Sequence, residues 1–186
     1  MDAILTSFGL VAIAEMGDKT QLLALFLATR FRRPWPIIGG ILAATVGNHL
    51  LASWVGVTVA DRIPLDWLRW GLGGSFLAMA AWTLVPDKLD GHDEAPRKDR
   101  GAFLTTLVTF FFVEMGDKTQ IATVALAAQF KSVWQVATGT TLGMMLADVP
   151  AVFLGERLTR AIPAATMRYC AAGLFGLFGC AILIGW

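Results

Sequence analysis

The stretch Glu15–Gln21 reads EMGDKTQ, and it occurs again, unchanged, at Glu114–Gln120, an offset of 99 residues. Outside these two EMGDKTQ motifs, the same ungapped offset aligns further identical residues, among them Phe31 with Phe130, Trp35 with Trp134, Gly40 with Gly139, and Ile63-Pro64 with Ile162-Pro163. Hydrophobic bias alone does not produce seven consecutive identities. We therefore interpret the chain as two related halves that arose by duplication.

The composition is typical of a membrane protein. The 186 residues are 56% hydrophobic and 16% charged, with a mean hydropathy of +0.63, whereas soluble domains have about 45–50% apolar and about 25% charged residues. Cys170 and Cys180 share one apolar run and lack metal or redox spacing, which excludes a disulfide scaffold. The net charge of +1 offers no electrostatic footprint for nucleic acid.

Six stretches are long and apolar enough to cross a bilayer, whose core of about 30 Å requires about 20 helical residues. They are residues 4–29, 37–60, 67–86, 102–129, 133–155 and 164–186. The first stretch has no basic segment before it and is longer than the core of a signal peptide, so we expect it to remain as a transmembrane helix. The predicted fold class is therefore an all-α integral membrane protein with six transmembrane helices.

The polar segment 88–100 divides these stretches into two groups of three. We predict a first three-helix repeat at 1–87, a polar linker at 88–100, and a second three-helix repeat at 101–186. Because each repeat contains an odd number of spans, the second must enter the membrane from the opposite side. Such inverted repeats place a transporter's binding site near mid-membrane, where the repeats meet.

Basic residues predict the orientation, because lysine and arginine are enriched in cytoplasmic loops. With six alternating spans, one side carries only Arg62, Arg69 and Lys131. The other side carries Arg30, Arg32, Arg33, Lys88, Arg97, Lys98, Arg100, Arg157, Arg160 and Arg168. We therefore expect the linker in the cytoplasm and both termini on the non-cytoplasmic side.

The two motifs place charged residues close to the middle of the first and fourth spans. These residues are Glu15, Asp18, Lys19, Glu114, Asp117 and Lys118. At roughly 2.5–3.5 kcal/mol each, their unpaired exposure to lipid would cost roughly 15–20 kcal/mol. That cost exceeds the usual net stability of about 5–15 kcal/mol. These groups must therefore face each other, a polar cavity, a cation or a proton.

The chemistry of the motifs favours a hard divalent cation. On a continuous helix, Glu15 and Asp18 share a face that Gln21 extends and Lys19 borders, while Gly17 permits either a close helix contact or a local break. Four carboxylates and two ammonium groups sum to −2, which one divalent cation or two protons neutralise. Oxygen ligands suit Mn²⁺, Ca²⁺ and Mg²⁺, and the lack of thiolate or paired histidine ligands disfavours zinc and copper.

We expect the cation ligands to be Glu15, Asp18, Gln21, Glu114, Asp117 and Gln120, with Thr20, Thr119, Lys19, Lys118, Asn48, His49 and Asp148 as accessory residues. Asn48-His49 aligns with Ala147-Asp148 in the second half. Asp148 is either an extra ligand, a proton acceptor or a partner for one of the lysines. His49 is either a proton carrier or a hydrogen-bonded residue between helices. The alternative for the motifs is that Glu15–Lys19 and its duplicate only stabilise helix turns.

The twin motifs resemble those of the Gdt-type Mn²⁺/Ca²⁺ transporters, among them the bacterial manganese exporters. The family hallmark is two E-x-G-D-[KR]-[ST] motifs in a short protein with two hydrophobic halves, and both copies here match it. The resemblance covers essentially the whole chain. It implies a secondary transporter of divalent cations, with Mn²⁺ and Ca²⁺ as substrates, protons as counter-ions, and the acidic motif residues as the cation site.

The expected function is therefore export of Mn²⁺, with Ca²⁺ as a second substrate, across the bacterial inner membrane in exchange for protons. The expected partners are the divalent cation, the proton and the lipid bilayer, and no resident cofactor or enzymatic activity is expected. Three alternatives remain open: a cation channel without obligatory exchange, an intramembrane hydrolase that uses a carboxylate pair, and a purely structural membrane subunit.

Overall fold

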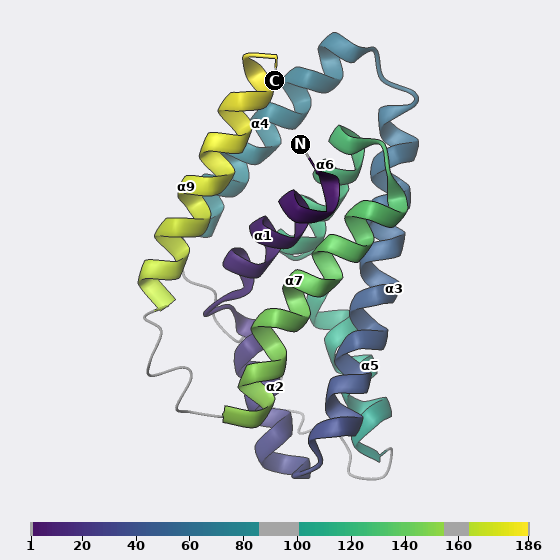
Figure 1. Ribbon diagram of the computed structural model, residues 1–186, viewed down its shortest axis with the longest axis vertical. Helices are drawn as coiled ribbons and strands as arrows, with labels where there is room; N and C mark the ends of the chain where they lie inside the picture. Colours follow the sequence, from purple (N-terminus) through teal and green to yellow (C-terminus); the bar gives the residue numbers. More distant parts are fainter. Residues whose placement is uncertain (1, 86–100, 155–163, 186) are drawn as a thin grey trace.

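The computed structural model describes residues 2–85, 101–154 and 164–185, and these residues form α-helices without any strand (Figure 1). The first half contains α1 (Ala3–Glu15), α2 (Lys19–Phe31), α3 (Pro34–Ala60) and α4 (Leu65–Thr83). The second half contains α5 (Gly101–Glu114), α6 (Lys118–Phe130), α7 (Val133–Leu154) and α9 (Ala164–Leu183). The helical fold class is confirmed for these residues, and the linker predicted at 88–100 lies outside them.

Both motif-bearing stretches consist of two helices with a break inside the motif. α1 ends at Glu15, and α2 begins after Asp18, which occupies its N-cap position. Between them Gly17 has a φ of 84°, a left-handed conformation that glycine adopts without steric cost. The second copy repeats this break, with a φ of 80° at Gly116 and Asp117 at the N-cap of α6. The prediction that Glu15 and Asp18 share the face of one continuous helix is therefore wrong.

Among the described residues, three helices are long and apolar enough to cross a membrane by length and composition: Pro34–Ala60, Val133–Leu154 and Ala165–Leu183. α1 and α5 are apolar but shorter, with 13 and 14 residues. At about 1.5 Å per residue, each would extend only about 20 Å. The break thus divides residues 4–29 and 102–129 into half-helices, which reach a spanning length only when placed end to end.

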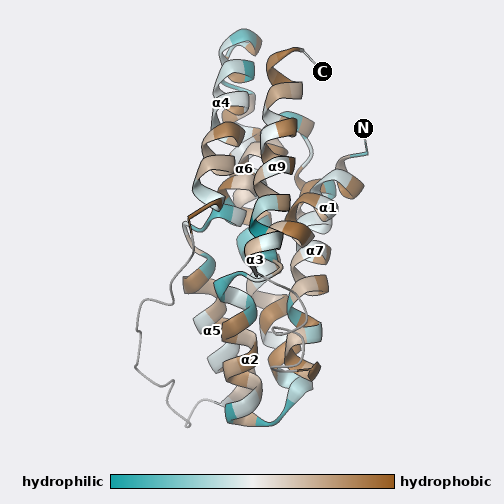
Figure 2. Cartoon of the chain, turned by 90° about the vertical axis from the view of Figure 1, so that its left-hand side faces the viewer, coloured by the Kyte–Doolittle hydropathy of each residue, from teal (hydrophilic) through white to brown (hydrophobic). Residues whose placement is uncertain are grey.

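The halves pack reciprocally. α1 packs against α7, α5 packs against α3, and α4 pairs with α9 (Figure 1). Both chain termini lie toward the same end of the molecule, as Figures 1 and 2 show. Figure 2 also shows hydrophobic residues along most of the helices, with hydrophilic residues near mid-height, where the breaks lie. The breaks of both halves therefore lie near mid-height of the bundle.

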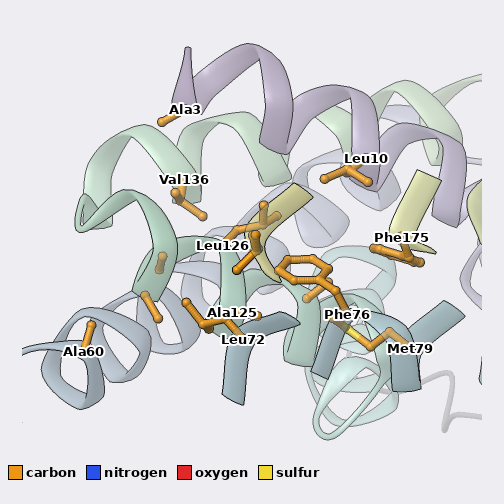
Figure 3. Packing of buried hydrophobic residues seen from close by; sticks show 14 of the residues in the cluster. Ala3, Leu10, Ala60, Leu72, Phe76, Met79, Ala125, Leu126, Val136 and Phe175 are labelled. Carbon is orange, nitrogen blue, oxygen red and sulfur yellow. The ribbon is translucent and has the colours of Figure 1, made fainter. Parts of the chain in front are cut away.

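Two apolar clusters hold the bundle together. The first joins α4 and α9 to α6 through Phe76, Phe175 and Leu126 (Figure 3), and the ring centroids of Phe76 and Phe178 lie 4.8 Å apart. The second cluster joins α2, α3, α5 and α7 and includes Leu27, Ile37, Ile41, Phe110 and Ala151. The first cluster also contains residues of α1, so α1 and α6 belong to the first cluster and α2 and α5 to the second. Along the chain, each break therefore separates the two clusters.

Glycines allow the reciprocal helix contacts. A Cβ atom on Gly139 of α7 would lie 2.5 Å from the carbonyl oxygen of Ile4 in α1. A Cβ atom on Gly40 of α3 would lie 2.7 Å from the carbonyl oxygen of Phe103 in α5. Both neighbours are backbone atoms, which cannot turn aside as a side chain can. The aligned glycines of the two halves therefore set the spacing between equivalent helix pairs.

We expect Gly139→Ala to destabilise the protein by about 1–3 kcal/mol, because the added methyl group overpacks the α1–α7 contact. Helix propensity alone predicts the opposite sign, since alanine is favoured over glycine by about 1 kcal/mol. The thermal unfolding midpoint of the purified protein measures the effect. Gly74→Ala is the matched control, because a Cβ atom there would meet nothing within 4 Å. An unchanged midpoint for Gly139→Ala would contradict the close contact.

Candidate cation site

Three carboxylates meet at the breaks. One carboxylate oxygen from each of Glu15, Asp18 and Asp117 lies within 4.8 Å of the other two. Glu15 is the last residue of α1, whereas the two aspartates precede α2 and α6. Glu15 and Asp117 are buried, and Asp18 is partly buried. The group, which we call the three-carboxylate site, therefore combines residues from both halves of the chain.

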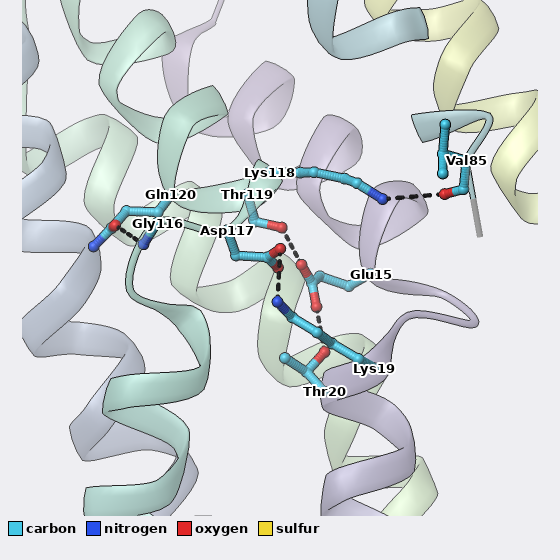
Figure 4. A network of polar contacts seen from close by, with 9 residues as sticks. All are labelled: Glu15, Lys19, Thr20, Val85, Gly116, Asp117, Lys118, Thr119 and Gln120. Atoms are coloured by element: carbon cyan, nitrogen blue, oxygen red, sulfur yellow. Dashed lines mark hydrogen bonds and ion pairs between the residues drawn. The ribbon is translucent and has the colours of Figure 1, made fainter. Parts of the chain in front are cut away.

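Hydroxyl groups from both motifs hold the Glu15 carboxylate. Thr20 Oγ1 donates a hydrogen bond to Glu15 Oε2 over 2.6 Å, and Thr119 Oγ1 donates one to Glu15 Oε1 (Figure 4). Both threonines are buried. Because Thr20 and Thr119 occupy the same position in the two motif copies, the two motifs converge on a single carboxylate.

The lysines of the two motifs have different surroundings. Lys19 Nζ lies 2.9 Å from Asp117 Oδ1, an ion pair between the two halves (Figure 4). Lys118 Nζ lies 3.5 Å from the carbonyl oxygen of Val85 and 5.7 Å from the ring centroid of Trp82. The alternative that each Glu–Lys pair stabilises one helix turn is contradicted, because the helix ends between these residues and Lys19 bridges to the other half.

The side chains of Gln21 and Gln120 stabilise the breaks by hydrogen bonds to the backbone. Gln21 Oε1 accepts a hydrogen bond from the Gly17 amide over 3.1 Å, and Gln120 Oε1 accepts one from the Gly116 amide over 2.6 Å. Gln21 Nε2 also donates to the carbonyl oxygen of Ala147 in α7 over 3.1 Å. Both predicted amide ligands thus form hydrogen bonds with the backbone of the turn. Figure 4 shows Gln120 on the far side of Asp117 from Glu15.

Glu114, the fourth predicted carboxylate, is not part of the three-carboxylate site. It is buried beside α3, where Thr45 Oγ1 donates to its Oε1 over 3.5 Å and the Asn48 side chain also contacts it. Asn48 Nδ2 donates in addition to the carbonyl oxygen of Phe111 over 3.0 Å. The sequence analysis did not predict Thr45 as a site residue. Its one indication in the sequence is a polar side chain within an apolar stretch.

Asp148 and His49 occupy aligned positions in α7 and α3 but have different surroundings. Asp148 is completely buried, and neither of its carboxylate oxygens has a hydrogen-bond partner among the described residues. It lies within electrostatic range of Glu15 and Glu114. His49 is also buried, with Nδ1 3.5 Å from Thr141 Oγ1 of α7. Of the two, only Asp148 interacts with the carboxylates of the motifs.

A small pocket adjoins the three-carboxylate site at Asp18. Its lining includes Asp18, Gly17, Thr83, Lys118 and Arg168. Thr83 and Arg168 come from α4 and α9, the paired helices that flank the breaks. Neither was predicted from the sequence, although the Arg168 position carries an arginine in both halves, at 69 and 168. The pocket therefore brings residues of α4 and α9 close to Asp18.

Comparison with known proteins identifies the family. The family model described as "Divalent cation/proton antiporter GDT1" matches residues 3–91 and 102–186, which covers both halves. A Vibrio cholerae protein with the provisional name of manganese exporter is 50% identical over 183 residues, 97% of this chain and 90% of that protein. The GDT1-like protein sll0615 of Synechocystis is 27% identical over 95% of this chain and 93% of its own length.

More distant relatives include GDT1-like protein 3 of Arabidopsis thaliana, which is 27% identical over 94% of this chain and 68% of its own length. No solved structure matches the chain. The family model and the relatives cover nearly the whole chain, including both EMGDKTQ motifs. On this evidence the chain belongs to the GDT1 family of divalent cation/proton antiporters.

Proposed function

We propose that this protein exports Mn²⁺ across the bacterial inner membrane in exchange for protons, and that the three-carboxylate site binds the ion. The observation that carries this proposal is the convergence of carboxylate oxygens from Glu15, Asp18 and Asp117 within 4.8 Å of one another. Distances of this order allow three oxygens to coordinate one cation after small side-chain adjustments. The Vibrio relative, named for manganese export, supports Mn²⁺ as the substrate.

The donor set supports a hard divalent cation. The site offers carboxylate oxygens with threonine hydroxyls beside them, and Mn²⁺ and Ca²⁺ prefer such ligands. Ca²⁺ is therefore the second candidate substrate. The three carboxylates and the Lys19 ammonium sum to −2, so one divalent cation neutralises the local charge. Two protons do so equally, which is the basis for exchange between the two kinds of ion.

In this proposal, Lys19 competes with the cation for the Asp117 carboxylate. Its ammonium lies against Asp117 and offsets the mutual repulsion of the buried carboxylates. An arriving Mn²⁺ competes with this ammonium for Asp117, because both bind the same carboxylate. The Lys19–Asp117 pair therefore keeps the empty site stable while limiting how tightly the cation is held, and a transporter needs this limit for release.

We further propose that the chain forms six spans in two inverted three-helix repeats, 1–87 and 101–186, with both termini on the non-cytoplasmic side. The reciprocal pairing of α1 with α7 and of α5 with α3 supports this arrangement, since a two-fold relation requires such exchange. Discontinuous helices that meet near mid-membrane are a common way for transporters to build a substrate site. Rocking of one repeat against the other would expose the site to each side in turn.

Transport in proteoliposomes tests the proposal. With purified protein, we expect uptake of ⁵⁴Mn²⁺ to accelerate when the lumen is acidic, because outward proton flow drives inward cation flow. Dissipating the proton gradient should slow uptake at least several-fold. A channel would instead conduct Mn²⁺ at a rate that does not depend on the proton gradient at fixed membrane potential, and that result would overturn the exchange mechanism.

A further inference from the structure

Arg69, near the start of α4, binds the end of α9. Its Nε donates a hydrogen bond to the carbonyl oxygen of Ile182 over 3.1 Å, and a second guanidinium nitrogen donates one to the carbonyl oxygen of Leu183. The last carbonyl groups of a helix lack partners within the helix, and a positive charge beside them is favourable. A Cβ atom on Gly185 would lie 3.2 Å from a guanidinium nitrogen of Arg69. Arg69 therefore holds the α4–α9 pair together where α4 begins and α9 ends.

The repeat predicts the same contact at the other end of the pair, where α9 begins and α4 ends. At the offset of 99 residues, the three residues of the Arg69 contact align with Arg168, Thr83 and Leu84. The structure differs here: among the described residues, no hydrogen bond joins the Arg168 side chain to Thr83 or Leu84. Arg168 is partly buried and lines, together with Thr83, the small pocket beside Asp18. The contact is therefore made at one end of the pair only.

The side chain of Thr83 carries an unmet polar group at this end. Its Oγ1 is buried and has no hydrogen-bond partner among the described residues, which is destabilising. The guanidinium group of Arg168, which lines the same pocket, carries five N–H donors. The pocket has a volume of about 20 Å³, room for little more than one water molecule, so it does not hold an anion such as phosphate. Thr83 therefore favours an approach of Arg168 to the end of α4.

The lysines of the two motifs differ between the halves in the same way. Lys118 Nζ lies 3.5 Å from the carbonyl oxygen of Val85, just beyond the end of α4, whereas its counterpart Lys19 pairs with Asp117. Identical motifs thus make different contacts in the two halves. When repeats related by a two-fold axis in the membrane plane exchange their conformations, the transporter faces the opposite side. The contacts missing from one half therefore belong to the opposite-facing conformation.

We propose that Arg69 and Arg168 are positioning residues that alternate during transport. Arg69 closes one end of the α4–α9 pair in the conformation described here. In the opposite-facing conformation Arg69 releases α9, and Arg168 closes the other end by donating to the carbonyl oxygens of Thr83 and Leu84. This inference rests on the proposed exchange function with its inverted repeats, and it names contacts that distinguish the two conformations.

Distances between two spin labels on the full chain in liposomes test the proposal. Ala81→Cys and Tyr169→Cys place the labels at exposed positions of α4 and α9 near the pocket. The exposed native cysteines, Cys170 and Cys180, are replaced by serine in this chain. We expect a longer distance from the conformation described here and a shorter distance from the conformation that Arg168 closes.

The two arginines should shift these distances in opposite directions. Arg69→Gln should raise the fraction of short distances several-fold, because it weakens the conformation described here, and Arg168→Gln should lower that fraction. The double variant should return toward the wild-type distribution, whereas a merely structural role predicts added losses. Arg62→Gln is the matched control and should change nothing, since Arg62 is exposed in the turn between α3 and α4.

The outcomes separate this inference from the proposed function. Shifts in the same direction, or no shift in either variant, would overturn the alternating contacts. If Arg69→Gln does not fold, Arg69→Lys decides, because lysine keeps the charge but lacks the planar fork: a raised fraction of short distances supports the contacts, and an unchanged fraction overturns them. Proton-driven ⁵⁴Mn²⁺ uptake by the wild type with unshifted distances overturns the contacts and leaves the proposed function intact. Opposite shifts without such uptake support the contacts and overturn the proposed function.

Discussion

Replacing Asp117 by asparagine should abolish Mn²⁺ transport and lower the affinity for Mn²⁺ on the order of 100-fold, because ligand charge sets the affinity of such sites. Asp117 contributes one of the three converging carboxylates and also holds Lys19 through an ion pair of 2.9 Å. The variant leaves the Lys19 ammonium without this partner and inside the site. Its positive charge then repels the cation that the remaining carboxylates attract.

The two roles of Asp117 can be separated with a double variant. Breaking a buried ion pair from one side costs about 3–5 kcal/mol, largely because a charge remains uncompensated. Asp117→Asn combined with Lys19→Met removes both charges, so we expect recovery of much of the thermal stability but not of transport. Asp66→Asn, on the exposed surface of α4, should leave both unchanged. Wild-type transport by Asp117→Asn would remove Asp117 from the binding site.

Replacing Gly116 by alanine should strongly impair transport, although the residue carries no functional group. Its φ of 80° costs an L-residue with a side chain about 1–2 kcal/mol. A Cβ atom at this position would meet nothing within 4 Å, so any effect comes from the backbone conformation. Relaxation of the strain turns the chain between Glu114 and Asp117, which moves the two carboxylates relative to each other.

Gly9→Ala provides the control for this prediction. Gly9 lies within α1, and a Cβ atom there would also meet nothing within 4 Å. It has an ordinary helical environment, so alanine should be neutral or slightly stabilising. The initial rate of ⁵⁴Mn²⁺ uptake and the unfolding midpoint, measured on both variants, decide the matter. Equal transport rates for Gly116→Ala and Gly9→Ala would show that the left-handed turn has no role.

The length and hydropathy of the apolar stretches predicted the positions of the continuous helices closely. The stretch 37–60 corresponds to Pro34–Ala60, and the stretch 133–155 corresponds to Val133–Leu154. Hydropathy did not locate the breaks, because apolar residues flank both motifs and an average over about 20 residues hides a turn. Gly17 allowed either a close helix contact or a break, and only the φ of 84° decides between them.

The sequence predicted which residue types form the candidate site but not which of them meet. The duplicated motif predicted a site with four carboxylates. The structure brings Glu15, Asp18 and Asp117 together but places Glu114 beside α3. The structure also pairs Lys19 with Asp117 of the other half. Such contacts between halves depend on how α1 packs on α7 and α5 on α3, and spacing within one motif carries no information on that packing.

The anomalous difference map of crystals soaked in Mn²⁺, recorded near the manganese absorption edge, tests the central claim most directly. We expect a peak between the carboxylates of Glu15, Asp18 and Asp117, with oxygens of all three side chains contacting the ion. Mn²⁺ bound only elsewhere, with these side chains apart or facing lipid, would contradict a shared cation site built from both halves of the chain.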